Sequence, residues 1–168
     1  MQFIRKLISR WSDYTELYSL LQAFFYFYNT NVVQPVSLAI NGASAVIAKT
    51  TNAAFFMVKG TLVKIAAAAT MPVLTGISIP NGSKQVTGFT VDGSGNLSRI
   101  DGNVATTVAG LIFPLPPNEY SVFIGYLIIE NATGSTFTGN TTALDAGSLT
   151  VTYVNESDAI YPINNTSL

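Results

Sequence analysis

The chain has 168 residues and a mass of 17.9 kDa, enough for one domain with a core of its own. Only 10% of its residues are charged, against about 25% in an average soluble domain, and the net charge is -1. With no net positive field, nucleic acid is not an expected partner. The absence of His and Cys excludes His-based acid–base catalysis, Cys–His pairs, zinc fingers and disulfide frameworks.

The low charge leaves two interpretations open for the surface, which is rich in Ser, Thr, Asn, Gly and Ala. Either large areas are covered by other molecules, or hydroxyl and amide side chains line the exterior of an ordinary β domain. A membrane partner is not expected, because the longest apolar stretches, 17–28 and 120–129, are shorter than the roughly 20 residues of a membrane span. Arg10 and Asp13 interrupt any secretory signal, so we expect the chain to stay as made.

Residues 1–28 carry apolar and aromatic side chains at alternating steps of three and four. The stripe consists of Ile4, Leu7, Trp11, Tyr14, Tyr18, Leu21, Phe25 and Tyr28. This heptad-like spacing predicts an amphipathic aromatic helix. Ser12 is a candidate N-cap, so the segment forms either one helix or two short ones broken there.

A second apolar row, Leu17, Leu20, Phe24 and Phe27, widens the face of this helix, so the helix must be covered. It could pack on the β domain of its own chain, anchor the chain on a partner or another copy, or lie on a membrane. Asp13 and Glu16 weaken the membrane alternative. We favour the anchor, with the eight stripe residues as the candidate interface.

Residues 29–35 are predicted to form a linker, since Asn and Pro do not continue a helix. Short segments with a period near two then predict strands. The expected strands are 36–40, 45–50, 54–58, 61–65, 86–92, 96–100, 122–130 and 149–155. This pattern predicts a mainly β fold, with a β-sandwich or jelly-roll-like domain over 36–156 after the helix and a tail over 157–168.

Turn residues separate several of these strands. Lys59-Gly60 predicts a tight hairpin, and the run from Asp92 to Asn96 predicts a second turn. Asn41-Gly42 and Asn81-Gly82 are further turn signals. Three prolines predict an extended crossing before the most apolar strand; they are Pro114, Pro116 and Pro117.

No motif in the β region predicts chemistry. Its acids are Asp92, Asp101, Glu119, Glu130 and Asp145, and two carboxylates could in principle pair as in a glycoside hydrolase. Most of them sit in Gly-rich predicted turns, Asp92-Gly93, Asp101-Gly102 and Asp145-Ala146-Gly147, where Asp satisfies its own backbone. We expect the strands to carry almost no charge. There is no dinucleotide loop, P-loop or calcium loop. We therefore expect no catalytic residues, no cofactor and no metal site.

The order of segments between about residues 45 and 155 resembles a module of bacteriophage virion proteins, those of the head-fibre or capsid-decoration type. The matching segments are Lys49-Thr50-Thr51-Asn52, 55–60, 62–64, 66–69, Phe89-Thr90-Val91-Asp92, 114–119, Ile124-Gly125-Tyr126-Leu127, 134–144 and Val151-Thr152-Tyr153. The order is more distinctive than any single segment. The N-terminal aromatic segment departs from the pattern, because it is longer than a plain decoration module would need, and this leaves the docking location open.

The resemblance implies an all-β, non-enzymatic appendage of the phage capsid. It would be made in the host cytoplasm, act as a homotrimer on the outer surface of the virion, and bind the major capsid protein or other virion proteins. Residues 1–28 would then be the capsid-side anchor. A minor capsid or neck protein is one alternative, and a depolymerase with two carboxylates is another. A receptor- or carbohydrate-binding fibre module for a host-surface glycan is a third, with the platform candidates Tyr120, Tyr126, Tyr153 and Tyr161.

Overall fold

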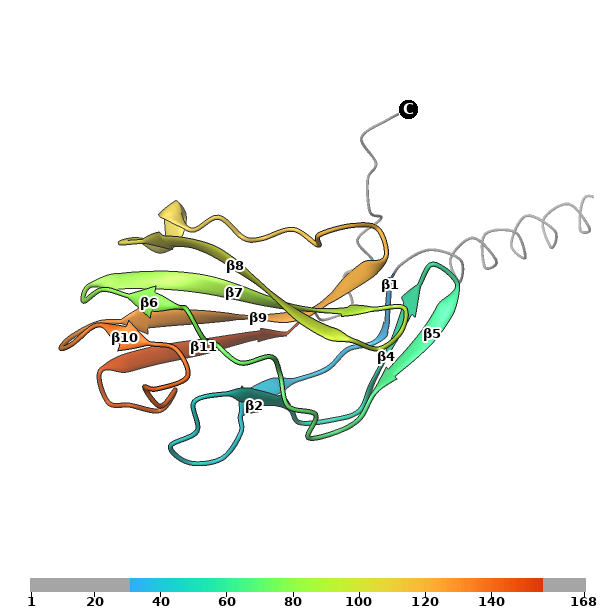
Figure 1. Cartoon of the computed structure of the whole chain (residues 1–168), viewed down its shortest axis with the longest axis horizontal. Coiled ribbons are helices and arrows are strands. Elements are labelled where there is room, and N and C mark those ends of the chain that lie inside the picture. Colours follow the sequence, from blue (N-terminus) through green and yellow to red (C-terminus); the bar gives the residue numbers. More distant parts are fainter. Residues whose placement is uncertain (1–30, 156–168) are drawn as a thin grey trace, which may run out of the picture.

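The computed structural model describes residues 31–155 of the chain. This part is mainly β, and its strands pair only in antiparallel fashion (Figure 1). A short 3-10 helix, η1 (Val108–Gly110), lies between β8 and β9. The strands are β1 (Asn31–Gln34), β2 (Leu38–Ile40), β3 (Ala48–Thr50), β4 (Ala54–Val58), β5 (Thr61–Ile65), β6 (Ser78–Ile79), β7 (Ser83–Asp92), β8 (Leu97–Ala105), β9 (Ser121–Asn131), β10 (Phe137–Thr138) and β11 (Leu149–Asn155).

The largest sheet has four strands in the order β11-β9-β7-β8. The longest strands of the described chain, β7 and β9, form its centre, and they are paired along almost their whole length, from Ser83 opposite Asn131 to Asp92 opposite Ser121. The register shifts once between Phe89 and Thr90, where Ile124 is the extra residue on β9. Since side chains alternate between the two sides of a strand, this sheet has an inner face and an outer face with different neighbours.

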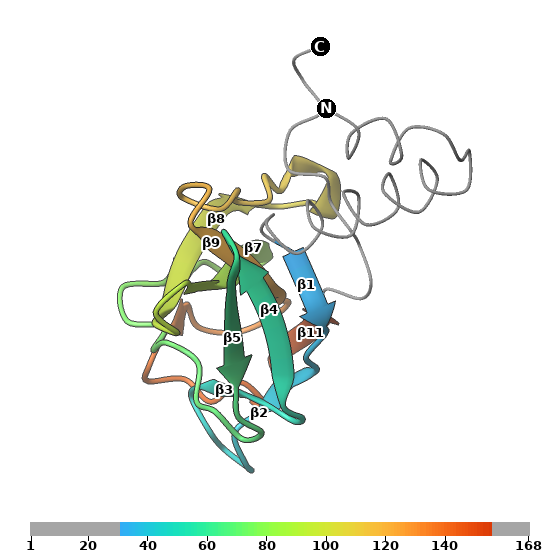
Figure 2. The same cartoon turned by 90° about the vertical axis from the view of Figure 1, so that its right-hand side faces the viewer.

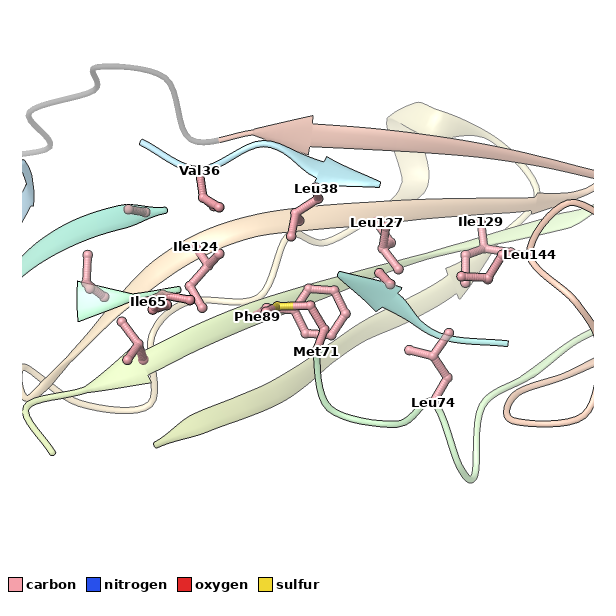
Figure 3. Close-up of a cluster of buried hydrophobic side chains, with 14 of the residues drawn as sticks. Val36, Leu38, Ile65, Met71, Leu74, Phe89, Ile124, Leu127, Ile129 and Leu144 are labelled. Atoms are coloured by element: carbon pink, nitrogen blue, oxygen red, sulfur yellow. The ribbon is translucent and has the colours of Figure 1, made fainter. Parts of the chain in front are cut away.

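Smaller sheets lie against the inner face of the four-stranded sheet. They are the β1-β4-β5 sheet and the pairs β2-β3 and β6-β10. Figure 1 shows β2 below the large sheet and the β4–β5 hairpin at its right-hand end, and Figure 2 looks onto the β1-β4-β5 sheet. Residues from both layers form one hydrophobic core, shown in part in Figure 3, in which Phe89 and Leu127 of the large sheet meet Ile65 and Met71.

The β4–β5 hairpin follows the predicted turn chemistry. Lys59 and Gly60 have φ values of 47° and 81°, and two successive residues with positive φ are the requirement of a type I′ turn. Strands β4 and β5 have the predicted bounds, and so does β11. Local sequence patterns were therefore sufficient to place these three strands.

Four sequence-based predictions need correction. Residues 31–34 of the predicted linker form β1, which pairs with β4. Asp101-Gly102, predicted as a turn, lies within β8. The first two expected strands are shorter, since only 38–40 and 48–50 are extended and paired. The strands are also not free of charge, because β7, β8 and β9 carry paired charges; these are Lys84, Arg99, Asp101 and Glu130.

The predicted helix over 1–28 and the whole of the predicted tail over 157–168 lie outside the described residues, as does Glu156. The two-residue strands β6 and β10 were not predicted, because two residues carry no measurable periodicity.

Candidate functional site

The interface predicted from the sequence lies outside the described residues. All eight of its members precede Asn31; they are Ile4, Leu7, Trp11, Tyr14, Tyr18, Leu21, Phe25 and Tyr28. The search for a site therefore turns to the acids, the tyrosines and the surface of residues 31–155.

Asp92 has the structural role expected of a turn residue. Its Oδ1 accepts hydrogen bonds from the backbone N–H of Ser94 at 2.8 Å and of Asn96 at 2.9 Å, and its Oδ2 accepts one from Asn96 Nδ2 at 2.9 Å. The Asn96 side chain, followed by the backbone N–H groups, holds the pKa of Asp92 below its ordinary value. The carboxylate closes the β7–β8 turn, which confirms the prediction for this residue.

Asp101 and Arg99 connect β8 to the inner layer. Arg99 Nη2 lies 2.9 Å from Asp101 Oδ2 and donates a hydrogen bond to the Thr75 carbonyl at 3.0 Å. Its Nη1 donates to the carbonyl of Val73. Thr87 of β7 donates to Asp101 Oδ1 at 3.2 Å. The bonds of Arg99 fix the 73–75 segment beneath the sheet. The bonds from Thr87 and Arg99 satisfy the Asp101 carboxylate, which explains why this residue lies in a strand and not in a turn.

The three other acids are also engaged. Glu119 pairs with Lys59 at 2.7 Å, and the hydrogen bond and charge of Lys59 lower the pKa of Glu119. Glu130 pairs with Lys84 at 2.6 Å across β7 and β9. Asp145 Oδ2 accepts a bond from the backbone N–H of Ser44 at 2.8 Å, which connects two distant loops.

Each of these five acids therefore has a hydrogen-bond or ion-pair partner within the domain. Within residues 31–155, no three Asp or Glu side chains come together as metal ligands. The arrangement supports a structural role for each carboxylate.

The candidate tyrosines do not converge. Tyr153 of β11 packs against the core, whereas Tyr126 of β9 contacts Phe123 and Phe113 on the outer face. Tyr120 is exposed, with the Lys59 ammonium 5.9 Å from its ring centre. Tyr161 lies outside the described residues. Tyr126 and Tyr153 therefore face opposite sides of the sheet and cannot share one sugar platform.

The segment from η1 to β9 crosses the outer face of the four-stranded sheet, above β8 in Figure 1. Two glycines of the sheet permit its close approach. A Cβ on Gly88 would lie 3.3 Å from Pro114 Cγ and 2.6 Å from Phe123 Cε1, and a Cβ on Gly102 would collide with the Ile112 carbonyl oxygen. We call residues 106–120 the crossing segment.

Hydrogen bonds from Asn103 of β8 fix the start of this crossing. Its Nδ2 donates to the Gly110 carbonyl at 2.9 Å, and its Oδ1 accepts from the Ile112 N–H at 2.6 Å. Leu111 and Pro114 are buried, so the crossing segment covers the apolar outer face with part of its side chains.

The remaining apolar side chains of the crossing segment are exposed. Ile112 is 67% exposed and Leu115 is 81% exposed, while Phe113 is 44% exposed and contacts the Tyr126 ring edge-on, with ring centres 5.5 Å apart. Val108 of η1 is exposed just before them in the chain. We call Val108, Ile112, Phe113 and Leu115 the outer apolar surface.

The sequence predicted an extended crossing here from its prolines but did not identify the surface. The signal was available: apolar residues such as Ile112, Phe113 and Leu115 stand in a Pro-rich segment that has no strand period to bury them. Which of them face outward depends on Asn103, Gly88 and Gly102, whose role is visible only in three dimensions.

No helix among the described residues is long and apolar enough to cross a membrane. No protein-family model matches the chain, and comparison with curated proteins and with solved structures gives no match.

Proposed function

We propose that the chain is a non-enzymatic structural protein of a phage virion, of the capsid-decoration or head-fibre type. Residues 1–28 anchor it on the major capsid protein or another virion protein through the aromatic stripe. The β domain, a sandwich or jelly-roll-like module, projects outward as part of a homotrimer. The order of its segments supports this proposal by resemblance.

The observation that carries the proposal is how the domain uses its polar and apolar groups. Its carboxylates form hydrogen bonds in turns and loops or ion pairs within the domain, while large apolar side chains of the crossing segment are exposed to solvent. Contact surface rather than a reactive cleft is typical of an assembly protein. Many copies fixed on one particle gain from multivalent contact, so individual contacts can be weak.

Quantitative mass spectrometry of purified particles tests the proposal. We expect on the order of hundreds of copies per particle for a decoration protein, because the capsid lattice repeats its docking site many times. A dozen or a few dozen copies would favour the minor capsid or neck alternative instead. Absence of the chain from purified particles would overturn the proposal.

Substitution in the aromatic stripe tests the anchor. The matched variants are Trp11→Gln with Tyr18→Gln, and Thr15→Gln with Ser19→Gln, which change polar positions of the same segment. We expect the first pair to reduce incorporation into particles and the second to leave it unchanged. Equal incorporation of both would show that the stripe is not the anchor.

A further inference from the structure

We infer that the outer apolar surface is where one copy of the chain packs against another. The inference deepens the proposed function, on which it rests for the association of copies. It assigns different contacts to two regions of the chain. The crossing segment holds copies together, while the aromatic stripe of residues 1–28 remains available for the capsid.

The extent of the surface agrees with an interface between copies. Its four side chains are exposed by 44% to 81%, and with roughly 150–200 Å² for a fully exposed large side chain they offer on the order of 400 Å². A standard interface removes about 800 Å² from each partner, about 56–65% of it apolar. The outer apolar surface therefore supplies most of the apolar part of one side of such an interface.

The backbone that carries these side chains is fixed before any contact forms. Asn103 holds Gly110 and Ile112 through two hydrogen bonds, and the buried Pro114 lies over Gly88. Little conformational entropy is then lost on association, which favours binding through this segment over binding through a free loop.

Charge distinguishes a second copy from other occupants. The outer apolar surface contains no charged residue, and the nearby Lys59–Glu119 and Lys84–Glu130 pairs compensate each other. Such a surface can meet an identical one without repulsion between like charges, whereas a partner chosen by opposite charge finds nothing to match. The two carboxylates of these pairs, Glu119 and Glu130, already have a cation and offer no unpaired charge to a basic segment such as that of Arg5, Lys6 and Arg10.

The test measures the mass of the full-length chain by sedimentation and light scattering. The variant Ile112→Glu with Leu115→Glu places charges at the two most exposed positions. We expect it to weaken association at least tenfold and to give a folded monomer where the unchanged chain is an oligomer. Leu62→Glu is the matched control, because Leu62 is 58% exposed on β5, outside the crossing segment, and it should leave the mass unchanged.

Two results would overturn the inference. They are a monomeric unchanged chain and a crossing-segment variant that keeps the oligomer. The first would also contradict the homotrimer of the proposed function, whereas the second would leave the homotrimer and the copy number per particle as proposed, so the inference and the proposed function can fail separately.

A second measurement covers the case in which the charged variant does not fold. The chain contains no Cys, so Leu115→Cys introduces a single thiol. A short bis-maleimide should join two copies through Leu115→Cys and should not do so through Leu62→Cys. Equal crosslinking of the two variants, or none, would contradict a contact through the outer apolar surface.

Discussion

The two faces of the β11-β9-β7-β8 sheet are built from the same strands but are covered in different ways. On the inner face, Phe89 and Leu127 are fully buried against side chains from the smaller sheets. On the outer face, one crossing segment does the covering, and it leaves Ile112 and Leu115 exposed. Burial on the inner face stabilises the domain, and exposure on the outer face makes contact with another molecule favourable.

The largest expected effect separates the two faces within one strand. Leu127 is fully buried on the inner face, and its neighbour Ile128 is half-buried on the outer face. We expect Leu127→Ala to lower the free energy of unfolding by about 2–5 kcal/mol, since it removes buried methyl groups and leaves a cavity. Ile128→Ala should cost about 1 kcal/mol.

Urea unfolding at one fixed protein concentration measures both variants. The concentration must be the same, because association of copies adds to the apparent stability. Equal losses for Leu127→Ala and Ile128→Ala would mean that the outer face is packed as tightly as the inner face, and the comparison would fail.

The next effect concerns the contact between the crossing segment and the sheet. In Gly102→Ala the added Cβ would lie 2.5 Å from Val86 Cγ1 and would collide with the Ile112 carbonyl oxygen, so the crossing segment has to move. We expect a loss of about 1–3 kcal/mol by thermal or urea unfolding. Gly147→Ala is the control, since nothing lies within 4 Å of its Cβ position, and it should change stability by no more than about 0.5 kcal/mol.

Gly102 also shows where sequence-based prediction reaches its limit. Asp101-Gly102 has the composition of a turn, yet Asp101 is satisfied by Thr87 and Arg99, and Gly102 is needed for the approach of Ile112. Contacts between distant segments overrode the local signal. The same applies to β1, where Asn and Pro indicated a linker but Val32 pairs opposite Phe56 of β4.

Prediction succeeded where the determinants are local. The β4–β5 hairpin is defined by Lys59-Gly60, and the β7–β8 turn is closed by the side chain of Asp92. The mainly β class followed from the strand period. The outer apolar surface could not be predicted in the same way, because its exposure results from hydrogen bonds and glycines of a different strand.

A third prediction uses Tyr153, which lies on the inner side of the edge strand β11. Burial, and to a lesser extent the negative charge of Asp145, raises the pKa of its phenol. The folded state therefore holds this proton more tightly than the unfolded state. The stabilisation is complete below the unfolded pKa of about 10 and is lost as the pH rises through the higher folded value.

We expect the thermal midpoint of the unchanged chain to fall at alkaline pH more steeply than that of Tyr153→Phe, which has no proton to lose. Tyr120→Phe, at an exposed position, is the control and should keep the steeper fall. If Tyr153→Phe shows the same alkaline slope as the unchanged chain, Tyr153 is not held in the inner packing.

The smallest expected effect concerns Asp92, in the turn where β7 passes into β8. Hydrogen bonds from Asn96 and Ser94 lower the pKa of this exposed carboxylate, so the folded state binds its proton more weakly than the unfolded state does. The stabilisation is present above the unfolded pKa of about 4 and is lost as the pH falls through the lower folded value.

The variant Asp92→Asn keeps an acceptor for the two backbone N–H groups but turns a donor toward Asn96 Nδ2. We expect a slightly lower thermal midpoint for Asp92→Asn at neutral pH and a difference that shrinks in acid, where the unchanged chain also carries a neutral side chain. A thermal-midpoint difference that stays constant from neutral pH into acid would show that the charge of Asp92 does not stabilise the β7–β8 turn. The turn would then depend only on the hydrogen bonds that the Asp92 side chain accepts.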